Sequence, residues 1–416
     1  MLLGRDNLKG YILGEHLPHT FSPQIHAMLA DYSYGVMEVA KEDLEQFMTE
    51  GNFDFLNVTI PYKKSVIPYL SKISPVAEKI GAINTIVREK DGSLTGHNTD
   101  YYGFEYTLIK SGISVEGAKV LVLGSGGASM PVRAVLESNG ASFVITISRS
   151  GEDNYENISR HYDADIIVNT TPVGMYPSNG EKVIELSEFT KCRGVIDIIY
   201  NPDKTALLLD AEMLGIAHIG GLPMLVAQAK RAAEIFTGDV ISDDEIDKIT
   251  SKISFDMKNI ILVGMPGCGK STIGNLLANK LSRPFFDSDI EFQKKYDISP
   301  AEAIKNYGEA KFRKMEHEII KTLGKTTGNI IATGGGVVTQ GINYAPLHQN
   351  GTIFFIERKL NSLSSENRPL SQSVGLHALY EKRLPLYINF SDYRIDNNGT
   401  EDETVNKIIE SMKAGN

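Results

Sequence analysis

The apolar and polar residues of this chain alternate in short blocks that predict an α/β protein. Apolar runs with the composition of buried strands occur at 10–14, 53–60, 119–123, 143–147, 164–169 and 194–202. Amphipathic stretches between these runs predict helices at 24–31, 101–110 and 220–238, and another that ends near residue 137. Because strands and helices alternate, the expected fold of this part is a doubly wound parallel sheet.

A glycine-rich turn follows the predicted strand 119–123. Its sequence, Gly-Ser-Gly-Gly-Ala-Ser at 124–129, is a compressed form of the dinucleotide fingerprint at a strand-to-helix turn. The next strand ends in Ser148-Arg149-Ser150, with no acidic residue at the ribose position. Arg149 can pair a 2′-phosphate, which favours NADP over NAD, unless it is a solvated loop arginine. The cofactor residues predicted here are Gly124, Ser125, Gly126, Gly127, Ala128, Ser148, Arg149 and Ser150.

Polar side chains also lie beside the predicted strands of the first hundred residues. Thr20 and Ser22 precede a helix, where capping by Ser22 before Pro23 is favoured over ligand binding. Lys63 follows a strand at the end where open α/β sheets bind ligands, although a surface lysine is the default interpretation. Asp100 begins a predicted helix and could be its N-cap. Read alone, Met224 and Leu225 of the last helix are core residues rather than cofactor contacts.

A second nucleotide motif lies further along the chain. Gly264-Met-Pro-Gly-Cys-Gly-Lys-Ser271 matches G-x-x-x-x-G-K-S between an apolar strand and a helix, and only chance glycines in a turn would otherwise explain it. In such a loop the backbone N–H groups surround phosphates, Lys270 reaches the β- and γ-phosphates and Ser271 binds Mg²⁺. The motif therefore predicts an ATP and Mg²⁺ site. The residues predicted to bind the nucleotide are Gly267, Cys268, Gly269, Lys270, Ser271 and Thr272, with Cys268 expected to be a small filler.

Carboxylates and glycines follow the P-loop. Asp287 and Asp289 end a predicted strand at i, i+2 spacing, so both side chains are expected on one face, suited to Mg²⁺ and a hydroxyl group. A turn with two solvated aspartates is the alternative. The strand at 330–333 runs into Gly334-Gly335-Gly336, where a ligand can approach the backbone closely.

Composition narrows the classes of partner. The 416 residues have a formal net charge of −10 and no Lys/Arg block, which argues against nucleic acid or an anionic membrane surface. Two cysteines provide no disulfide framework, and neither a signal peptide nor a long apolar run is evident, so a soluble cytoplasmic protein is expected. A homo-oligomer is left open.

The pattern of residues 242–253 predicts a short helix with a Ser242–Glu245 capping box and with Ile246, Ile249 and Ile253 on one face.

The first part of the chain resembles shikimate dehydrogenase. Eight ordered segments carry the resemblance: HTFSP at 19–23, NVTIPYK at 57–63, GAINT at 81–85, NTD at 98–100, GSGGAS at 124–129, NTTPVGM at 169–175, DIIYNP at 197–202 and GLPMLVAQA at 221–229. The resemblance implies reversible, NADPH-dependent reduction of 3-dehydroshikimate, with Lys63 as the catalytic lysine and Asp100 as its acidic partner. It also implies substrate contacts by Thr20, Ser22, Thr59, Asn84, Tyr200 and Gln228, and a nicotinamide contact by Gly221. Thr20 stands where the family usually has serine.

The last part resembles shikimate kinase over about 258–412. The resemblance is carried by DSD at 287–289, GEAKFR at 308–313, TGGGV at 333–337, NRPL at 367–370 and the R-x-P-L-Y run from Arg383. It implies Mg²⁺-dependent phosphoryl transfer from ATP to the 3-hydroxyl of shikimate, with Asp289 accepting the hydroxyl proton and Asp287 supporting the metal. Arg313 and Arg383 would bind the substrate carboxylate, Gly335 would contact the substrate, and Arg368 would act on the phosphates from a lid. The lid at 361–365 lacks the extra arginine often found upstream of that position.

The sequence thus predicts a bifunctional enzyme of the shikimate pathway. We expect a substrate domain at 1–103 completed by 222–238, a Rossmann-like NADP domain at 104–238, a linker helix at 239–257, and a P-loop domain like nucleoside-monophosphate kinases at 258–416. One alternative is a shikimate-responsive regulator without turnover, which should have lost Lys63, Asp100, Lys270 or Asp289. Another is a dehydrogenase that accepts quinate, for which Thr20 is the position of interest.

Overall fold

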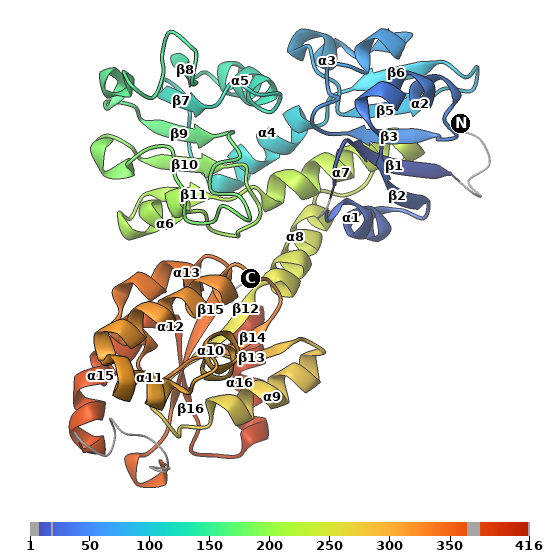
Figure 1. The fold of residues 1–416 in the computed structure, drawn as a ribbon. Coiled ribbons are helices and arrows are strands. Elements are labelled where there is room, and N and C mark those ends of the chain that lie inside the picture. The colour runs from blue at the N-terminus through green and yellow to red at the C-terminus, as the bar shows by residue number, and fades with distance from the viewer. Residues whose placement is uncertain (1–7, 18–19, 364–374, 415–416) are drawn as a thin grey trace. The chain divides into compact units, whose positions relative to one another are not determined.

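A computed structural model describes residues 8–17, 20–363 and 375–414 of the chain (Figure 1). Contacts within the chain group it into two compact units. The first unit comprises Met1–Val173, Lys182–Tyr200 and Asp210–Thr250, and the second comprises Gly174–Glu181, Asn201–Leu209 and Ser251–Asn416. The unit that contains the P-loop therefore also takes in two short segments from the earlier part of the sequence. Among the described residues, none of the helices has both the length and the apolar character that crossing a membrane requires.

The first unit begins with a six-stranded mixed sheet in the order β2-β1-β3-β5-β6-β4. β3 pairs antiparallel with β5 and β5 with β6, whereas the remaining pairs are parallel. The strands are β1 (Lys9–Gly14), β2 (Ser33–Glu38), β3 (Phe55–Val58), β4 (Lys72–Ile73), β5 (Thr85–Arg88) and β6 (Leu94–His97), and the helices are α1 (Ser22–Leu29), α2 (Leu44–Glu50) and α3 (Pro75–Ile80). Leu13 of β1, Leu56 of β3 and Ile86 of β5 are fully buried and supply the core of this sheet.

The second sheet of this unit is entirely parallel, in the order β11-β10-β9-β7-β8. Its strands are β7 (Lys119–Leu123), β8 (Phe143–Ile147), β9 (Ile166–Asn169), β10 (Gly194–Asp197) and β11 (Ala217–Ile219). The helices in this part of the sequence are α4 (Asp100–Ser111), α5 (Ser129–Ser138), α6 (Ala206–Met213), whose residues up to Leu209 group with the second unit, and α7 (Leu222–Thr237). α4 and α7 pack against each other between the two sheets (Figure 1). They therefore carry residues of the later sequence to the strand ends of the first sheet.

Helix α8 (Asp244–Met257) corresponds to the predicted helix at 242–253, and Ile246, Ile249 and Ile253 are buried as expected. The predicted capping box is wrong in its contacts. The Ser242 hydroxyl accepts the N–H of Asp244 at 3.3 Å, and the Glu245 carboxylate pairs with Lys248 at 2.6 Å. The helix starts too late for Glu245 to lie three residues beyond its cap, so its side chain turns to a lysine on its own helix instead.

The second unit is built on a five-stranded parallel sheet in the order β13-β14-β12-β15-β16. Its strands are β12 (Asn259–Val263), β13 (Phe285–Asp287), β14 (Ile330–Ala332), β15 (Gly351–Glu357) and β16 (Tyr393–Asp396). Its helices are α9 (Lys270–Leu281), α10 (Ser288–Tyr296), α11 (Pro300–Tyr307), α12 (Glu309–Gly324), α13 (Tyr344–His348), α15 (Leu376–Phe390) and α16 (Glu401–Ala414). Short 3-10 turns at 41–43, 67–69, 158–161, 186–188, 337–339, 341–343 and 360–362 complete the described elements.

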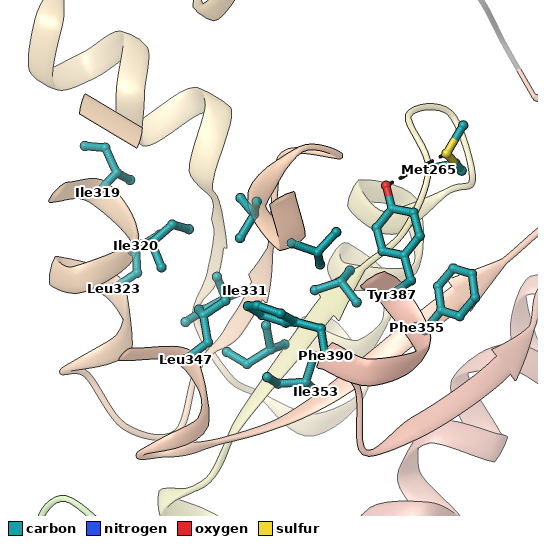
Figure 2. Packing of buried hydrophobic residues seen from close by; sticks show 14 of the residues in the cluster. Met265, Ile319, Ile320, Leu323, Ile331, Leu347, Ile353, Phe355, Tyr387 and Phe390 are labelled. Atoms are coloured by element: carbon teal, nitrogen blue, oxygen red, sulfur yellow. Dashed lines mark hydrogen bonds between the residues drawn. The ribbon is translucent and has the colours of Figure 1, made fainter. Parts of the chain in front are cut away.

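A buried apolar cluster joins this sheet to α12, α13 and α15 (Figure 2). Ile331 and Ile353 supply it from the sheet, and Phe390 supplies it from α15. The Tyr387 ring stacks on Phe355, with ring centroids 4.9 Å apart. Figure 2 shows the Tyr387 hydroxyl directed to Met265 of the P-loop, so the core reaches directly beneath the nucleotide motif. The three sheets confirm the predicted α/β class, with the first sheet mixed rather than parallel throughout.

Candidate active sites

The first unit contains a cavity of about 290 Å³ where β1, β3, α1, α4 and α7 come together. All eight residues predicted to act on or bind the substrate of this unit line it: Thr20, Ser22, Thr59, Lys63, Asn84, Asp100, Tyr200 and Gln228. These residues come from segments spread over more than two hundred positions. The packing of α4 and α7 between the sheets explains how Asp100 and Gln228 reach the same space as Lys63.

Lys63 and Asp100 form an ion pair inside this cavity. Their Nζ and Oδ2 atoms are 2.5 Å apart, and the side chains are 16% and 4% exposed. Asp100 does not cap α4, because Thr99 is the N-cap residue and the Asp100 carboxylate turns to Lys63 instead. A default surface lysine would extend into solvent, whereas Lys63 is a cation held in one place by a buried carboxylate.

Asn84 fixes the start of the helix that carries Asp100. Its Oδ1 accepts the Thr99 N–H at 2.7 Å, and its Nδ2 donates to the Thr99 hydroxyl at 3.1 Å. The same Nδ2 lies 3.5 Å from Oε1 of Gln228, which joins α7 to the network. The amide therefore holds two helices in register around the ion pair.

The predicted capping role of Ser22 is wrong. α1 begins at Ser22 with Phe21 as the N-cap residue, and no side chain caps the helix. Thr20 is the residue whose hydroxyl accepts a backbone N–H, that of Ser22, at 3.2 Å. Because Ser22 lies inside the first turn, its hydroxyl is not used by the helix terminus, and both hydroxyls line the cavity.

His26 is a lining residue that the sequence reasoning missed. Its Nδ1 lies 2.6 Å from the Tyr32 hydroxyl, and its ring stacks on Tyr34 with centroids 3.9 Å apart. Burial lowers the pKa of His26 to about 3, against a smaller opposing effect of a hydrogen bond with Asn57. His26 is therefore neutral near pH 7. A histidine on the inner face of a helix gives no sequence signal that separates it from a core residue.

Other lining residues without an earlier assignment include Leu17, Asn57, Ile60 and Ile198. Met224 is 5% exposed and packs in the core as predicted, whereas Leu225 is only half-buried, and both residues line the cavity.

The predicted dinucleotide residues lie at the carboxyl ends of β7 and β8, which are parallel neighbours. Gly124 has φ +102°, and the backbone N–H groups of Ser125 to Ala128 make no hydrogen bond within the described part of the chain. Ser148, Arg149 and Ser150 follow β8, with Arg149 and Ser150 exposed. Of this predicted set, Ala128 and Gly221 line the 290 Å³ cavity, while the other residues lie outside it. A side chain at Gly221 would overlap the Ile198 backbone, so only glycine allows this approach.

A second cavity, of about 460 Å³, opens at the carboxyl ends of β12, β13 and β14 in the second unit. It is lined by Gly267, Gly269, Lys270, Ser271 and Thr272 of the P-loop, together with Asp287, Asp289, Arg313, Gly335 and Arg383 from the predicted set. Cys268, which is also among the residues predicted to bind the nucleotide, is buried and absent from the lining, so its side chain fits the expectation of a small filler instead. The predicted lid residue Arg368 lies outside the described residues.

The P-loop holds its lysine against its own backbone. α9 begins at Lys270, and Gly269 precedes it in a left-handed conformation with φ +98°. Lys270 Nζ donates to the carbonyl groups of Gly264 and Met265, both at 3.0 Å. The ammonium group is thus positioned at the mouth of the loop by acceptors that an incoming phosphate oxygen can replace.

The two aspartates that follow the P-loop line the cavity, but not as an extended pair. β13 ends at Asp287, which is the N-cap of α10 and accepts the N–H of Asp289 at 3.0 Å. Asp289 therefore lies in the first turn of a helix, and the predicted strand geometry is wrong there. The Ser271 hydroxyl donates to Asp287 at 2.7 Å, which places the two predicted metal ligands side by side.

Each of the three glycines at 334–336 leaves space that a different neighbouring group fills. A Cβ on Gly334 would lie 2.8 Å from Asp289 Oδ1, and a Cβ on Gly335 would lie 2.7 Å from Pro266 Cδ. A Cβ on Gly336 would overlap the Arg313 guanidinium. The loop therefore packs against a carboxylate, the P-loop and an arginine with its backbone alone.

Arg313 and Arg383 meet this loop from two helices. Arg313 pairs with Glu316 at 2.8 Å and Glu309 at 3.0 Å, while its buried Nε has no partner in the described structure. Burial raises the pKa of Glu316, although Arg313 opposes the shift. Arg383 donates to the Gly335 carbonyl at 3.1 Å, and Tyr387 donates to the same oxygen at 2.5 Å. Both guanidinium groups are thereby held at the wall of the cavity. Arg358 also lines this cavity, and the sequence reasoning missed it.

Both units thus belong to the class of α/β enzymes whose ligands bind at the carboxyl ends of parallel strands. Residues 12–86 match the family model of the shikimate dehydrogenase substrate binding domain, and residues 266–413 match the shikimate kinase family model. A shikimate dehydrogenase (NADP(+)) from Methanosphaera stadtmanae is 36% identical over 278 residues, which cover 60% of this chain and 97% of that protein.

Solved structures show the same relationship. A chorismate mutase/shikimate 5-dehydrogenase fusion protein from Clostridium acetobutylicum is 34% identical, with a TM-score of 0.56 over 60% of this chain and 97% of that chain. A shikimate 5-dehydrogenase from Thermus thermophilus, crystallised with NADP(H) and shikimate, is 28% identical, with a TM-score of 0.54 over 59% and 99% of the two chains. The chain belongs to the shikimate dehydrogenase family and carries a shikimate kinase domain after it.

Proposed function

We propose that this protein makes shikimate in its first unit and phosphorylates shikimate in its second. The first reaction is the NADPH-dependent reduction of 3-dehydroshikimate, and the second is the Mg²⁺-dependent transfer of a phosphoryl group from ATP to the 3-hydroxyl. The observation that carries the proposal is the convergence of the predicted residues on two cavities, with the Lys63–Asp100 pair in one and the P-loop with Asp289 in the other. The hydroxyl formed by the reduction is the one that the kinase then uses.

In the first cavity, Lys63 supplies the proton that the reduction requires. When bound, NADPH provides the hydride for the 3-keto carbon. The oxygen of that carbonyl gains negative charge as the reaction proceeds, and the Lys63 ammonium stabilises this charge and donates a proton to it. Asp100 holds the ammonium group in place inside the cavity. Thr20, Ser22, Asn84 and Gln228 line the same cavity. The hydroxyls of Thr20 and Ser22 would hold the carboxylate of the substrate, and Asn84 and Gln228 would hold its hydroxyl groups.

The residues of the glycine turn fit a dinucleotide phosphate. The N–H groups of Ser125 to Ala128, which no acceptor in the described part of the chain engages, precede the ten-residue helix α5, where both the helix dipole and the donors favour an anion. Arg149 is exposed just after β8, and its guanidinium group would pair a 2′-phosphate. We therefore assign NADP(H) to this turn.

In the second cavity, Asp289 prepares the attacking hydroxyl. When bound, MgATP provides the γ-phosphoryl group. Asp289 accepts a hydrogen bond from the 3-hydroxyl and then its proton, which makes the oxygen a better nucleophile. Arg313 and Arg383 hold the substrate carboxylate, since the guanidinium fork matches a carboxylate and the Arg313 Nε is a buried donor without a partner.

The polar groups beside the P-loop fit ATP and Mg²⁺. Ser271 and Asp287 offer one hydroxyl and one carboxylate within 2.7 Å of each other, and the described residues contain no cluster of three or more His, Cys, Asp or Glu that could hold a metal. Mg²⁺ commonly takes one or two protein ligands and completes its shell with water and phosphate oxygens. This sparse set suits a metal that arrives with the nucleotide.

The proposal is tested with the full-length protein, 3-dehydroshikimate, NADPH and MgATP. NADPH oxidation and ADP release are followed together, and shikimate 3-phosphate is identified as the product. We expect Lys63→Ala to abolish NADPH oxidation while added shikimate still drives ADP release. We expect Asp289→Ala to abolish ADP release while NADPH oxidation continues. Lys64→Ala, which replaces an exposed neighbouring lysine, should retain both reactions. Loss of both activities from either of the first two changes would contradict two independent sites.

A further inference from the structure

Arg358 stands at a strand end beside the P-loop. β15 lies between β12 and β16, and all three strands run parallel. Their carboxyl ends therefore open at one edge of the sheet, with the P-loop after β12, Arg358 after β15 and Asn397 after β16. The backbone of β15 is close enough that a Cβ on Gly264 would lie 2.5 Å from the Ile356 carbonyl oxygen.

The backbone around Arg358 is fixed on both sides. The Glu357 carbonyl accepts the Asn397 N–H at 2.8 Å, and the Lys359 N–H donates to Asn398 Oδ1 at 2.9 Å. Asn397 in turn donates from Nδ2 to the Cys268 carbonyl at 2.8 Å, which ties the loop to the P-loop itself. The position of Arg358 relative to the P-loop is thus set before any ligand arrives.

The guanidinium of Arg358 differs from the other cations of the cavity. Lys270 and Arg383 donate to backbone carbonyls, and Arg313 pairs with two glutamates. Arg358 is half-buried, and within the described part of the chain its side chain has neither a hydrogen bond nor an ion pair. The adjacent carboxylate, Glu357, is already held by Arg394 at 2.6 and 2.8 Å and by the Tyr380 hydroxyl at 2.9 Å.

The direction of the side chain indicates what it binds. Arg358 Nη1 lies 3.9 Å from the position of a Cβ on Gly269, the residue that precedes α9. At that point the helix dipole and the loop N–H groups already favour an anion. A partly desolvated cation without a counterion is unfavourable, and a guanidinium is well matched to phosphate oxygens. Between residues 359 and 374 the sequence has a single further arginine, Arg368, so few other guanidinium groups can serve this end of the cavity.

We propose that Arg358 binds the phosphate chain of the nucleoside triphosphate, as a second fixed cation beside Lys270. This inference rests on the proposed kinase function and adds a residue to it. Its role is to bind and orient the phosphates by charge. A neutral residue at this position should therefore weaken binding of the nucleotide and leave binding of the acid that is phosphorylated unchanged.

The test measures nucleotide binding by the full-length protein. MgADP and the non-hydrolysable analogue MgAMP-PNP are titrated calorimetrically into wild type, Arg358→Gln, Arg358→Lys and Lys359→Gln. We expect Arg358→Gln to raise Kd about tenfold, as for loss of one charged hydrogen bond. Arg358→Lys should stay within about threefold of wild type, because it keeps the charge. Lys359→Gln removes the same charge from the exposed neighbouring position and should change Kd by less than twofold.

Kinetic constants provide the second measurement. Arg358→Gln should raise KM for ATP about tenfold and leave KM for shikimate within twofold of wild type. Binding of MgADP by Arg358→Gln within twofold of wild type would overturn the proposal. Equal losses in Arg358→Lys and Arg358→Gln would also overturn it, since a contribution made by charge should largely survive the change to lysine. Failure of the wild type to bind MgADP would instead refute the kinase function itself, so the two failures are distinguishable.

Discussion

The two cavities hold their charged side chains in different ways. In the first, Lys63 and Asp100 satisfy each other, and the neighbouring His26 is neutral. In the second, four cations and three carboxylates line the wall: Lys270, Arg313, Arg358, Arg383, Asp287, Asp289 and Glu316. The first arrangement suits one small acid and one proton, whereas the second suits a polyphosphate, its metal and a carboxylate at once.

The difference teaches where each site is vulnerable. A buried pair fails when either partner is removed, because the other is left as an unpaired charge away from water. A site lined by four cations that are held independently should lose part of its ligand binding when one of them is changed, since the other three remain in place. The first site should therefore lose almost all activity when one partner of its pair is substituted, whereas the second should lose ligand affinity in steps as its cations are substituted.

The largest effect is expected from the buried pair. Asp100→Asn keeps the size of the side chain but leaves Lys63 without a counterion, so kcat for NADPH oxidation should fall about 10³-fold. Glu105→Gln is the matched control, because it removes a carboxylate from the same helix outside the cavity. A loss of less than tenfold in Asp100→Asn would show that Lys63 is aimed by other groups.

The next effect should come from crowding the second site. Gly336→Ala places a methyl group on the Arg313 guanidinium, so the carboxylate of shikimate should lose its partner and KM for shikimate should rise about thirtyfold. KM for ATP should change much less. Gly341→Ala is the control, because nothing lies within 4 Å of its added Cβ. Equal changes in KM for shikimate in Gly336→Ala and Gly341→Ala would show that Arg313 does not take part in substrate binding.

A third prediction concerns acid stability and applies to the first site alone, since no histidine is among the described residues that line the second. The pKa of His26 is about 3 in the fold, mainly because of burial, and about 6.5 in the unfolded chain. The unfolded state therefore binds an extra proton between these values. The stabilisation is complete above pH 6.5 and is lost as the pH falls, by about 1.4 kcal/mol per pH unit.

Urea unfolding of the full chain between pH 7 and pH 5 measures this dependence. Between pH 7 and pH 5, His26→Gln should reduce the slope of the free energy of unfolding against pH by up to about 1.4 kcal/mol per pH unit. This change in slope is expected whatever the substitution does to the absolute stability. His377→Gln should leave the slope unchanged, because the side chain of His377 is 76% exposed. An unaltered slope in His26→Gln would mean that His26 titrates equally in both states.

The smallest effect should come from one hydroxyl beneath the second site. Tyr387→Phe keeps the ring on Phe355 (Figure 2) but removes one of the two donors to the Gly335 carbonyl. With Arg383 still bound to that oxygen, kcat/KM for shikimate should fall about fivefold. Tyr393→Phe, which removes a hydroxyl from β16 outside the cavity, should leave kcat/KM within twofold. A hundredfold loss in Tyr387→Phe would give the hydroxyl a direct role in the reaction.

Much of the fold could be predicted because parallel strands that are buried on both faces appear in the sequence as uninterrupted apolar runs. β7 and β8 have the bounds of the apolar runs 119–123 and 143–147. Helix starts were harder to place. Ser22 and Asp289 each lie inside the first turn of a helix, and a shift of one or two residues there changes which side chain is the cap. Local sequence leaves that shift undecided, because packing of the helix on its sheet determines it.

The site residues divide in the same way. Those within contiguous motifs, such as Lys63 and Lys270, could be identified from their neighbours in the sequence. His26 and Arg358 could not, because a lone histidine on an apolar helix face and a lone arginine after a strand occur throughout ordinary proteins. Their positions become informative only when the fold places His26 next to Asn57, and Arg358 next to Gly269.

The three consecutive glycines at 334–336 also bear on how this enzyme can evolve. A Cβ at each position would crowd a different neighbour, so a change that relieves one position leaves the other two crowded. A library randomised across these three codons should return glycine at each of them after selection for growth on the kinase, while codon 341 drifts freely. These three residues should therefore stay glycine while the sequence of the rest of the domain diverges.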